Sequence, residues 1–267
     1  MVKPTKAATT RMATTVTAHY SSASGATDAF YLDGRISRRR EKKTADITLD
    51  REDRGFFFAV FANTSSANTE NPTSDRPKRA LDRMHQSIKQ TGRNIDSEIN
   101  ELADTAVEVA GRITLQQDSV RQPYFSGVVI RESELAAITM GGGCAYLYRN
   151  EIIYPLTANG HPLEPIDLDG NPVEKLTIYC AGVAGPVRYS NIAQLQIDDG
   201  VILCNRELME AVGQQEVLRL LHDTEYQSDM ADLVMTAAST TTPSTSHQFM
   251  IGFVKTISTA ERPVWFK

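Results

Sequence analysis

The first part of the chain alternates short apolar runs with polar breaks. β-Branched residues favour a strand at residues 13–22, and residues 29–32 predict a second short strand that turns at Asp33-Gly34. Residues 55–61, Gly-Phe-Phe-Phe-Ala-Val-Phe, give the strongest core signal, because a fully apolar and aromatic run of this length is typical of a buried central strand. We therefore expect a hairpin-like start followed by a central strand.

Helical and extended patterns then alternate towards the end of the chain. Residues 79–118 predict one or two amphipathic helices with a break at Thr91-Gly92. Short apolar runs between turn residues predict an antiparallel meander over residues 127–154, with a tight hairpin turn at Gly141 to Gly143. The remaining predicted elements are a strand at residues 176–181, a hairpin at 194–204, helices at 207–222 and 229–238, and a closing strand at 249–254.

This order of elements predicts the α+β class. Strands and helices come in groups rather than in the βαβ alternation of a parallel sheet, so we expect a four-layer α-β-β-α sandwich of two antiparallel sheets flanked by helices. We expect an N-terminal extension with the start of the first strand at residues 1–18, a single domain at residues 19–256, and a C-terminal tail at residues 257–267.

Composition narrows the classes of partner and the compartment. The chain has 267 residues and a formal net charge of −5, which gives no global reason to expect nucleic acid or an anionic membrane as partner. No apolar stretch approaches the roughly 20 residues of a spanning helix. The three cysteines, Cys144, Cys180 and Cys204, show no C-x-x-C pairing, which favours buried, reduced thiols and a cytoplasmic protein.

Five strings stand in order along the chain, at residues 27–30, 55–66, 141–149, 199–208 and 247–254. In the same order they resemble the motifs N-E-D-A-F, F-x-V-x-D-G-x-G-G, G-D-S-R-A-Y-L-Y-R, G-D-x-L-L-L-C-S-D-G-L and D-N-x-T-V-x-V-V. These motifs are those of the metal-dependent Ser/Thr protein phosphatases of the PPM (type 2C) family, and the resemblance covers about residues 20–255. It implies that family's sandwich of two antiparallel sheets and a relation to its bacterial members.

The resemblance also implies a chemistry that this sequence departs from. The family uses two hard cations, Mg²⁺ or Mn²⁺, to hold a bridging water, and such ions need several carboxylate ligands. Asp28 stands where the family has its first aspartate, but Ala62 occupies the place of the bridging aspartate and Asn63 that of the following glycine. The central ligand is therefore lost.

The remaining site positions are changed as well. Gly142 replaces an aspartate that bacterial members use for an additional metal, and Arg206 falls where a metal-binding aspartate belongs. His247 or Gln248 takes the place of the last aspartate, and Ala23 that of the phosphate-gripping arginine. The resemblance thus implies a vestigial metal site.

Arg206 is the most informative of these changes. A fixed guanidinium repels a dication, and we expect it to form an ion pair with Asp28 in the vacated site. The alternative is that Arg206 points to solvent from the first turn of a helix. Glu207 is either a replacement carboxylate or an ordinary acidic residue at a helix start, and His247 is either a metal ligand or a hydrogen-bonded histidine.

A basic run at residues 35–43 is predicted to be a loop. Arg38, Arg39 and Arg40, together with Arg206, are candidates to contact a phosphate or an acidic partner, and the alternative is a solvated charged loop.

These observations favour a catalytically inactive, pseudophosphatase-like domain that acts as a binding or regulatory module in signalling. We expect no cofactor, no nucleic-acid or membrane partner, and a protein partner of the phosphoprotein or kinase class. Two alternatives stay open. One is an active phosphoprotein phosphatase with an atypical site, in which Asp28 binds Mg²⁺ or Mn²⁺, and the other is a structural module of a larger assembly.

Overall fold

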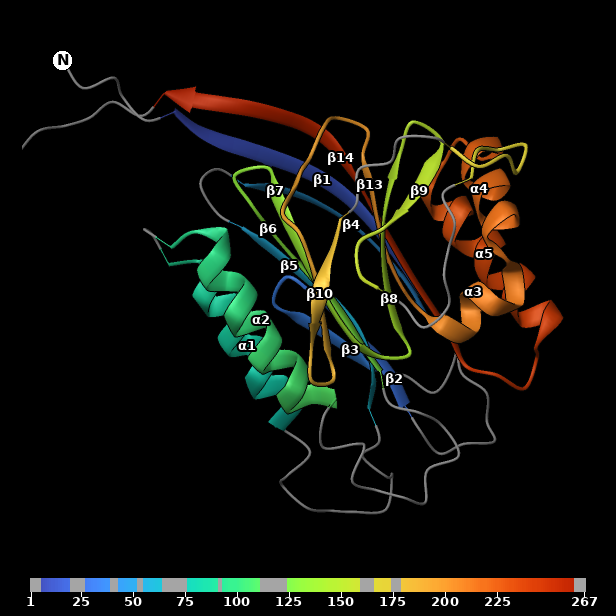
Figure 1. The fold of residues 1–267 in the computed structure, drawn as a ribbon, viewed down its shortest axis with the longest axis horizontal. Helices are drawn as coiled ribbons and strands as arrows, with labels where there is room; N and C mark the ends of the chain where they lie inside the picture. Colours follow the sequence, from blue (N-terminus) through green and yellow to red (C-terminus); the bar gives the residue numbers. More distant parts are fainter. Residues whose placement is uncertain are drawn as a thin grey trace, which may run out of the picture.

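The computed structural model describes residues 6–19, 27–38, 43–51, 55–63, 76–90, 93–110, 124–158, 166–173 and 179–261. Within these residues, two antiparallel sheets lie between two groups of helices, as Figure 1 shows. The predicted four-layer α+β sandwich is confirmed. In the described residues no helix is long and apolar enough to cross a membrane.

The first sheet has six strands. Their order across the sheet is β4 (Lys43–Arg51), β1 (Lys6–His19), β14 (His247–Glu261), β13 (Gly200–Asn205), β8 (Gly143–Arg149) and β9 (Ile152–Pro155). The helices α3 (Arg206–Val212), α4 (Gln214–Asp223) and α5 (Gln227–Thr241) cover its outer face (Figure 1).

The second sheet has eight strands. Their order is β10 (Cys180–Ala184), β11 (Val187–Ser190), β7 (Glu134–Gly141), β6 (Tyr124–Arg131), β5 (Phe56–Asn63), β2 (Thr27–Leu32) and β3 (Arg35–Arg38), with β12 (Ala193–Gln194) paired to β7. The helices α1 (Arg76–Ile88) and α2 (Ile95–Ala110) cover its outer face. Two helices are therefore present where one or two were predicted, and the predicted break at Thr91-Gly92 lies outside the described residues.

Strand β5 shows why a central strand of this fold has a continuous apolar sequence. Phe58 and Val60 point into the core between the two sheets, while Phe57 and Phe61 point towards α1 and α2. Because successive side chains alternate between the faces and both faces are covered, every side chain from Phe56 to Ala62 is buried. The prediction of a buried central strand from this run is confirmed.

Two hairpins predicted from turn residues are wrong. Gly142 is the single residue between β7 and β8, but β7 belongs to the eight-stranded sheet and β8 to the six-stranded one, so the chain crosses between sheets here. A Cβ on Gly143 would lie 2.0 Å from the carbonyl oxygen of Phe125, and only glycine fits this close approach. Likewise, β12 pairs with β7 whereas β13 pairs with β8 and β14.

The edges of the sheets differ from the sequence prediction too. Residues Arg35–Arg38, expected in a loop, form strand β3 opposite β2, and Lys43–Arg51 form the unpredicted strand β4. Strands β1 and β14 are longer than predicted because they pair with each other from Lys6 opposite Glu261 to His19 opposite His247. The domain limits remain a prediction.

A buried ion-pair network joins the outer helices to the eight-stranded sheet. Arg131, at the end of β6, donates to the backbone carbonyls of Ile88 at 3.0 Å and Gln90 at 2.8 Å, where α1 ends. Its Nη1 also lies 3.3 Å from Oε1 of Glu98 on α2. The other oxygen of Glu98 accepts a hydrogen bond from the Ser87 hydroxyl at 3.0 Å, and burial raises the pKa of this carboxyl group.

Candidate functional site

Asp28 and Ala62 are direct neighbours across the strand pair β2–β5. Their Cα atoms are register partners, and both residues are buried. At this vestigial position the methyl group of Ala62 therefore lies next to the buried carboxyl group of Asp28. The next register pair in this ladder is Thr27 and Asn63, and Asn63 is the last residue of β5.

Gly142 and Arg206 are also brought together. The backbone N–H of Arg206 donates to the carbonyl oxygen of Gly142 at 2.7 Å. A Cβ on Gly142 would meet Oε2 of Glu207 at 3.8 Å and the Cβ atoms of Arg206 and Tyr124 at 3.9 Å, which is ordinary van der Waals contact. The position therefore has room for a side chain, and Glu207 is the carboxylate that faces it.

A buried polar cluster connects this position to β14. The backbone N–H of Gln248 donates to Oδ1 of Asn205 at 2.9 Å, and the Tyr124 hydroxyl donates to Oε1 of Gln248. The amide nitrogen of Asn205 donates to Oε2 of Glu207 and to the carbonyl oxygen of Ser246, both at 2.9 Å. Asn205 thereby fixes the carboxylate of Glu207.

The predicted ion pair between Arg206 and Asp28 is not formed in the described part of the chain. Arg206 instead pairs with Glu210 one turn later on α3, with 3.7 Å between Nε and Oε1. Its side chain keeps 34% of its surface exposed. A residue four positions ahead on the same helix face is the nearest partner that a helical arginine can reach, and it competes with the more distant aspartate.

His247 is held by hydrogen bonds within its own segment. Its Nε2 lies 2.8 Å from the hydroxyl of Thr242 and 3.3 Å from the carbonyl oxygen of the same residue. The residue is fully buried on β14, opposite His19 of β1. This arrangement is that of a hydrogen-bonded structural histidine, the second of the two readings of its sequence position.

The basic run is only partly within the described residues. Arg38 ends β3, where it pairs with Ala29 at the edge of the eight-stranded sheet. Arg39 and Arg40 lie outside the described residues, as does Ala23. A phosphate or partner contact by these arginines stays a prediction.

The side chains at the vestigial positions do not fit a pair of hard dications. Mg²⁺ and Mn²⁺ need several oxygen ligands arranged around each ion. Among the described residues, no group of three or more His, Cys, Asp or Glu side chains is arranged to hold a metal ion. Asp28 contributes a carboxyl group, but its neighbour Ala62 contributes none, and Gly142 and Gln248 have no charge.

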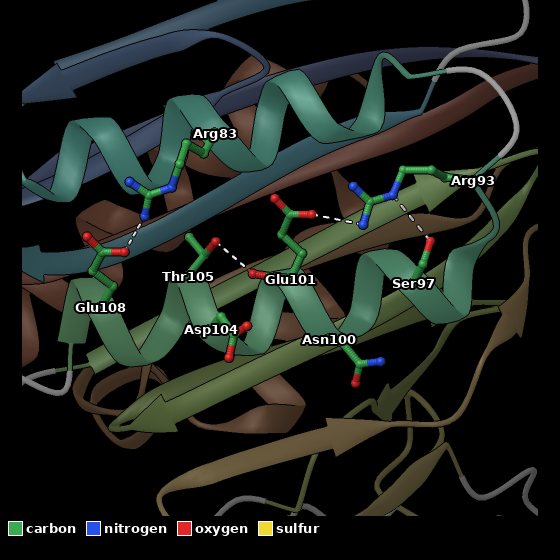
Figure 2. Close-up of a pocket in the computed structure, with 8 residues that line it drawn as sticks. All are labelled: Arg83, Arg93, Ser97, Asn100, Glu101, Asp104, Thr105 and Glu108. Carbon is green, nitrogen blue, oxygen red and sulfur yellow. Dashed lines mark hydrogen bonds and ion pairs between the residues drawn. The ribbon is translucent and has the colours of Figure 1, made fainter.

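A polar groove lies elsewhere, between α1 and α2 on the outer face of the eight-stranded sheet. Figure 2 shows its lining, and its volume is about 470 Å³. The residues that line it are Arg83, Arg93, Ser97, Asn100, Glu101, Asp104, Thr105 and Glu108. Both arginines already face carboxylates, Arg83 that of Glu108 and Arg93 that of Glu101 (Figure 2). The groove therefore offers no free cation to an anionic ligand.

Comparison with known proteins places the fold but not the activity. No protein-family profile and no curated protein matches the sequence. Among solved structures, the catalytic domain of the serine/threonine phosphatase PstP, in complex with two manganese ions, is 12% identical, with a TM-score of 0.55 and coverage of 93% of this chain and 100% of that one.

Two further structures agree with it. The serine/threonine phosphatase of S. agalactiae is 11% identical, with a TM-score of 0.58 and coverage of 91% of this chain and 100% of that one. The phosphatase domain of the cell fate determinant SpoIIE from Bacillus subtilis is 12% identical, with a TM-score of 0.51 and coverage of 97% of both chains. At these identities the likeness concerns the fold alone.

Proposed function

We propose that this chain, which has the fold of the PPM (type 2C) protein phosphatase domains, is a catalytically inactive relative of them. It acts by binding a signalling protein of the phosphoprotein or kinase class rather than by hydrolysing a phosphate ester. The retained fold supplies the surface, and the changed residues remove the chemistry.

The observation that carries this proposal is the pairing of Asp28 with Ala62. In a two-metal site a carboxylate that bridges both ions is the ligand that holds them together. Here the corresponding position is a buried methyl group on the strand next to Asp28. Because the Ala62 side chain is buried, a carboxylate can occupy this position only if residue 62 itself is replaced.

Arg206 adds electrostatic repulsion of metal ions to the loss of the bridging carboxylate. Two unit charges of the same sign about 5 Å apart repel by about 3 kcal/mol at an effective dielectric constant near 20, and a dication experiences twice this energy. The Cβ atom of Arg206 lies next to Gly142. The ion pair of Arg206 with Glu210 is partly exposed, which leaves the guanidinium group able to reach an acidic or phosphorylated segment of a partner.

Metal titration tests the proposal directly. Calorimetric titration of the purified chain with Mn²⁺ and Mg²⁺ should give no saturable binding, and an aryl phosphate with Mn²⁺ should give no turnover above buffer. Tight binding of either ion, or Mn²⁺-dependent turnover that Arg206→Ala abolishes, would overturn it in favour of an active phosphatase with an atypical site.

A gain-of-ligand variant provides the positive control. Ala62→Asp combined with Gly142→Asp and Arg206→Asp returns carboxylates to three vestigial positions, and a Cβ added to Gly142 makes only ordinary van der Waals contacts. We expect this variant to bind Mn²⁺. The matched variant Ala62→Asn, Gly142→Asn, Arg206→Asn has the same shape without the charge and should not.

A further inference from the structure

Two cysteines lie side by side on neighbouring strands of the six-stranded sheet, each two residues from a vestigial position, Gly142 or Arg206. Cys144 on β8 and Cys204 on β13 are register partners in the antiparallel ladder. Both belong to the apolar cluster between this sheet and α3, α4 and α5, and both are free thiols. Neither has any role in the polar cluster around Asn205.

The strand pairing already sets the spacing that a disulfide needs. The N–H of Arg206 donates to the carbonyl oxygen of Gly142, and these residues stand two positions beyond Cys204 and Cys144 in the same ladder. Hydrogen-bonded pairs recur every second residue, so the cysteines form such a pair, with Cα atoms about 5.5 Å apart. Disulfides span Cα separations of about 4.4 to 6.8 Å.

We propose that Cys144 and Cys204 are a reversible redox pair, which oxidants of the hydroperoxide class convert into a disulfide between β8 and β13. In the first step the Cys144 thiolate attacks a peroxide oxygen, the O–O bond breaks, and a sulfenic acid and one water form from hydrogen peroxide. In the second step the Cys204 sulfur attacks the sulfenic sulfur and displaces a second water. Two thiols are oxidised and one peroxide is reduced.

The surroundings of the two thiols assign their roles. The hydrogen bond with the Cys204 thiol lowers the pKa of Cys144, although burial and the charge of Glu207 act against this shift. Burial raises the pKa of Cys204. Both thiols are buried, with Cys144 2% and Cys204 0% exposed, and Sγ of Cys144 lies 3.9 Å from the carbonyl oxygen of Gly142 at the crossing between sheets. Cys144 therefore reacts first and Cys204 resolves the sulfenic acid.

The bond would act on the rim of the vestigial site. Sulfur atoms in a disulfide are about 2.05 Å apart. A bond between the two cysteines would therefore cross-link the start of β8 to the end of β13, which continue into Gly142 and into Asn205-Arg206. This inference does not depend on the proposed function, because the bond forms or fails to form whatever the chain binds.

The test uses the full chain carrying Cys180→Ser, which removes the half-buried third thiol on the other sheet. The reduced protein is treated with hydrogen peroxide, and thiols, intact mass and non-reduced peptides are measured. We expect the loss of two thiols and two hydrogens per chain, a peptide linking Cys144 to Cys204, and full reversal by dithiothreitol. The proposal would be overturned if both thiols stayed reduced at a peroxide concentration that oxidises glutathione, or if sulfinic and sulfonic acids were the only products.

Single substitutions separate the two roles. In Cys204→Ala a dimedone adduct should appear at Cys144, and in Cys144→Ala the oxidation of Cys204 should slow at least tenfold. Oxidation of Cys204 at an unchanged rate in Cys144→Ala would refute the assignment of the attacking thiol. If either variant fails to fold by circular dichroism, the peptide map of the Cys180→Ser chain decides alone.

Discussion

Replacing Arg131 by alanine removes the cation that ties both outer helices to the eight-stranded sheet. Its side chain is 8% exposed and binds the end of α1 through two backbone carbonyls and α2 through Glu98. After the substitution the carboxylate of Glu98, which is 1% exposed, keeps the Ser87 hydroxyl and Arg93 at 3.5 Å. The carbonyl oxygens of Ile88, which is buried, and of Gln90 lose a charged donor.

The expected cost follows from this loss. Removing one partner of a buried ion pair costs about 3–5 kcal/mol, because the remaining charge stays buried. Domains have total stabilities of about 5–15 kcal/mol, so Arg131→Ala should remove a large part of the free energy of unfolding. The double variant Arg131→Met with Glu98→Gln should cost less than Arg131→Ala, because no charge is left uncompensated.

Urea unfolding followed by circular dichroism measures these differences from the shift of the midpoint and the slope. Arg219→Ala is the matched control, since Arg219 is an exposed arginine paired with Glu216 and Asp223 on α4 and should leave the midpoint unchanged. A cost below about 1 kcal/mol for Arg131→Ala, or a double variant as unstable as the single one, would refute the assignment of the network as a structural tie.

Two further predictions concern a charge and a close contact. Because burial raises the pKa of Glu98, the folded state binds more protons than the unfolded one above the ordinary carboxyl pKa, so stability from this group falls as pH rises through that window. The stability of the wild-type chain relative to Glu98→Gln should therefore increase as pH is lowered from 7 towards about 4.5, and a urea midpoint of the wild type that falls relative to that of Glu98→Gln over this range would contradict this. Gly143→Ala should destabilise by about 3 kcal/mol or prevent folding, since its Cβ would lie 2.0 Å from the Phe125 carbonyl oxygen. Gly142→Ala should change stability by less than about 0.5 kcal/mol in the same urea unfolding assay.

The layers of the fold could be predicted from local pattern, but some connections could not. The run at residues 55–61 identified a buried central strand, and the helical spacing over residues 79–118 predicted one or two helices, of which the structure has two, α1 and α2. Gly141 to Gly143 predicted a change of direction, but turn residues do not say which sheet the next strand joins. Edge strands carry charges that keep them from pairing with other chains, so β3 and β4 looked like loop sequence.

The candidate site was predictable only where motifs carried it. The motif resemblance assigned Asp28, Ala62, Gly142 and Arg206 to one vestigial site, and the structure brings Ala62 next to Asp28 and Gly142 next to Arg206. The cluster of Tyr124, Asn205 and Gln248 was missed, because it depends on three strands that only the topology makes adjacent.

The pairing of Arg206 with Glu210 had a signal in the sequence, the spacing of four residues between opposite charges on a helix. The hypothesis of a pair with Asp28 gave too little weight to this local competitor. Local helix geometry therefore determined the orientation of Arg206.

The one-residue link between β7 and β8 also limits how this protein can adapt to what it binds. With Gly143 pressed against the Phe125 carbonyl, the connection has no slack, and at this edge the sheets cannot slide past each other or separate without breaking strand pairing. The rim next to Gly142 is thus a rigid wall of preset width. In the proposed binding function, accommodation of a partner there would come from rotamer changes in side chains such as Arg206, and recognition would rest on matching of shape rather than on opening and closing.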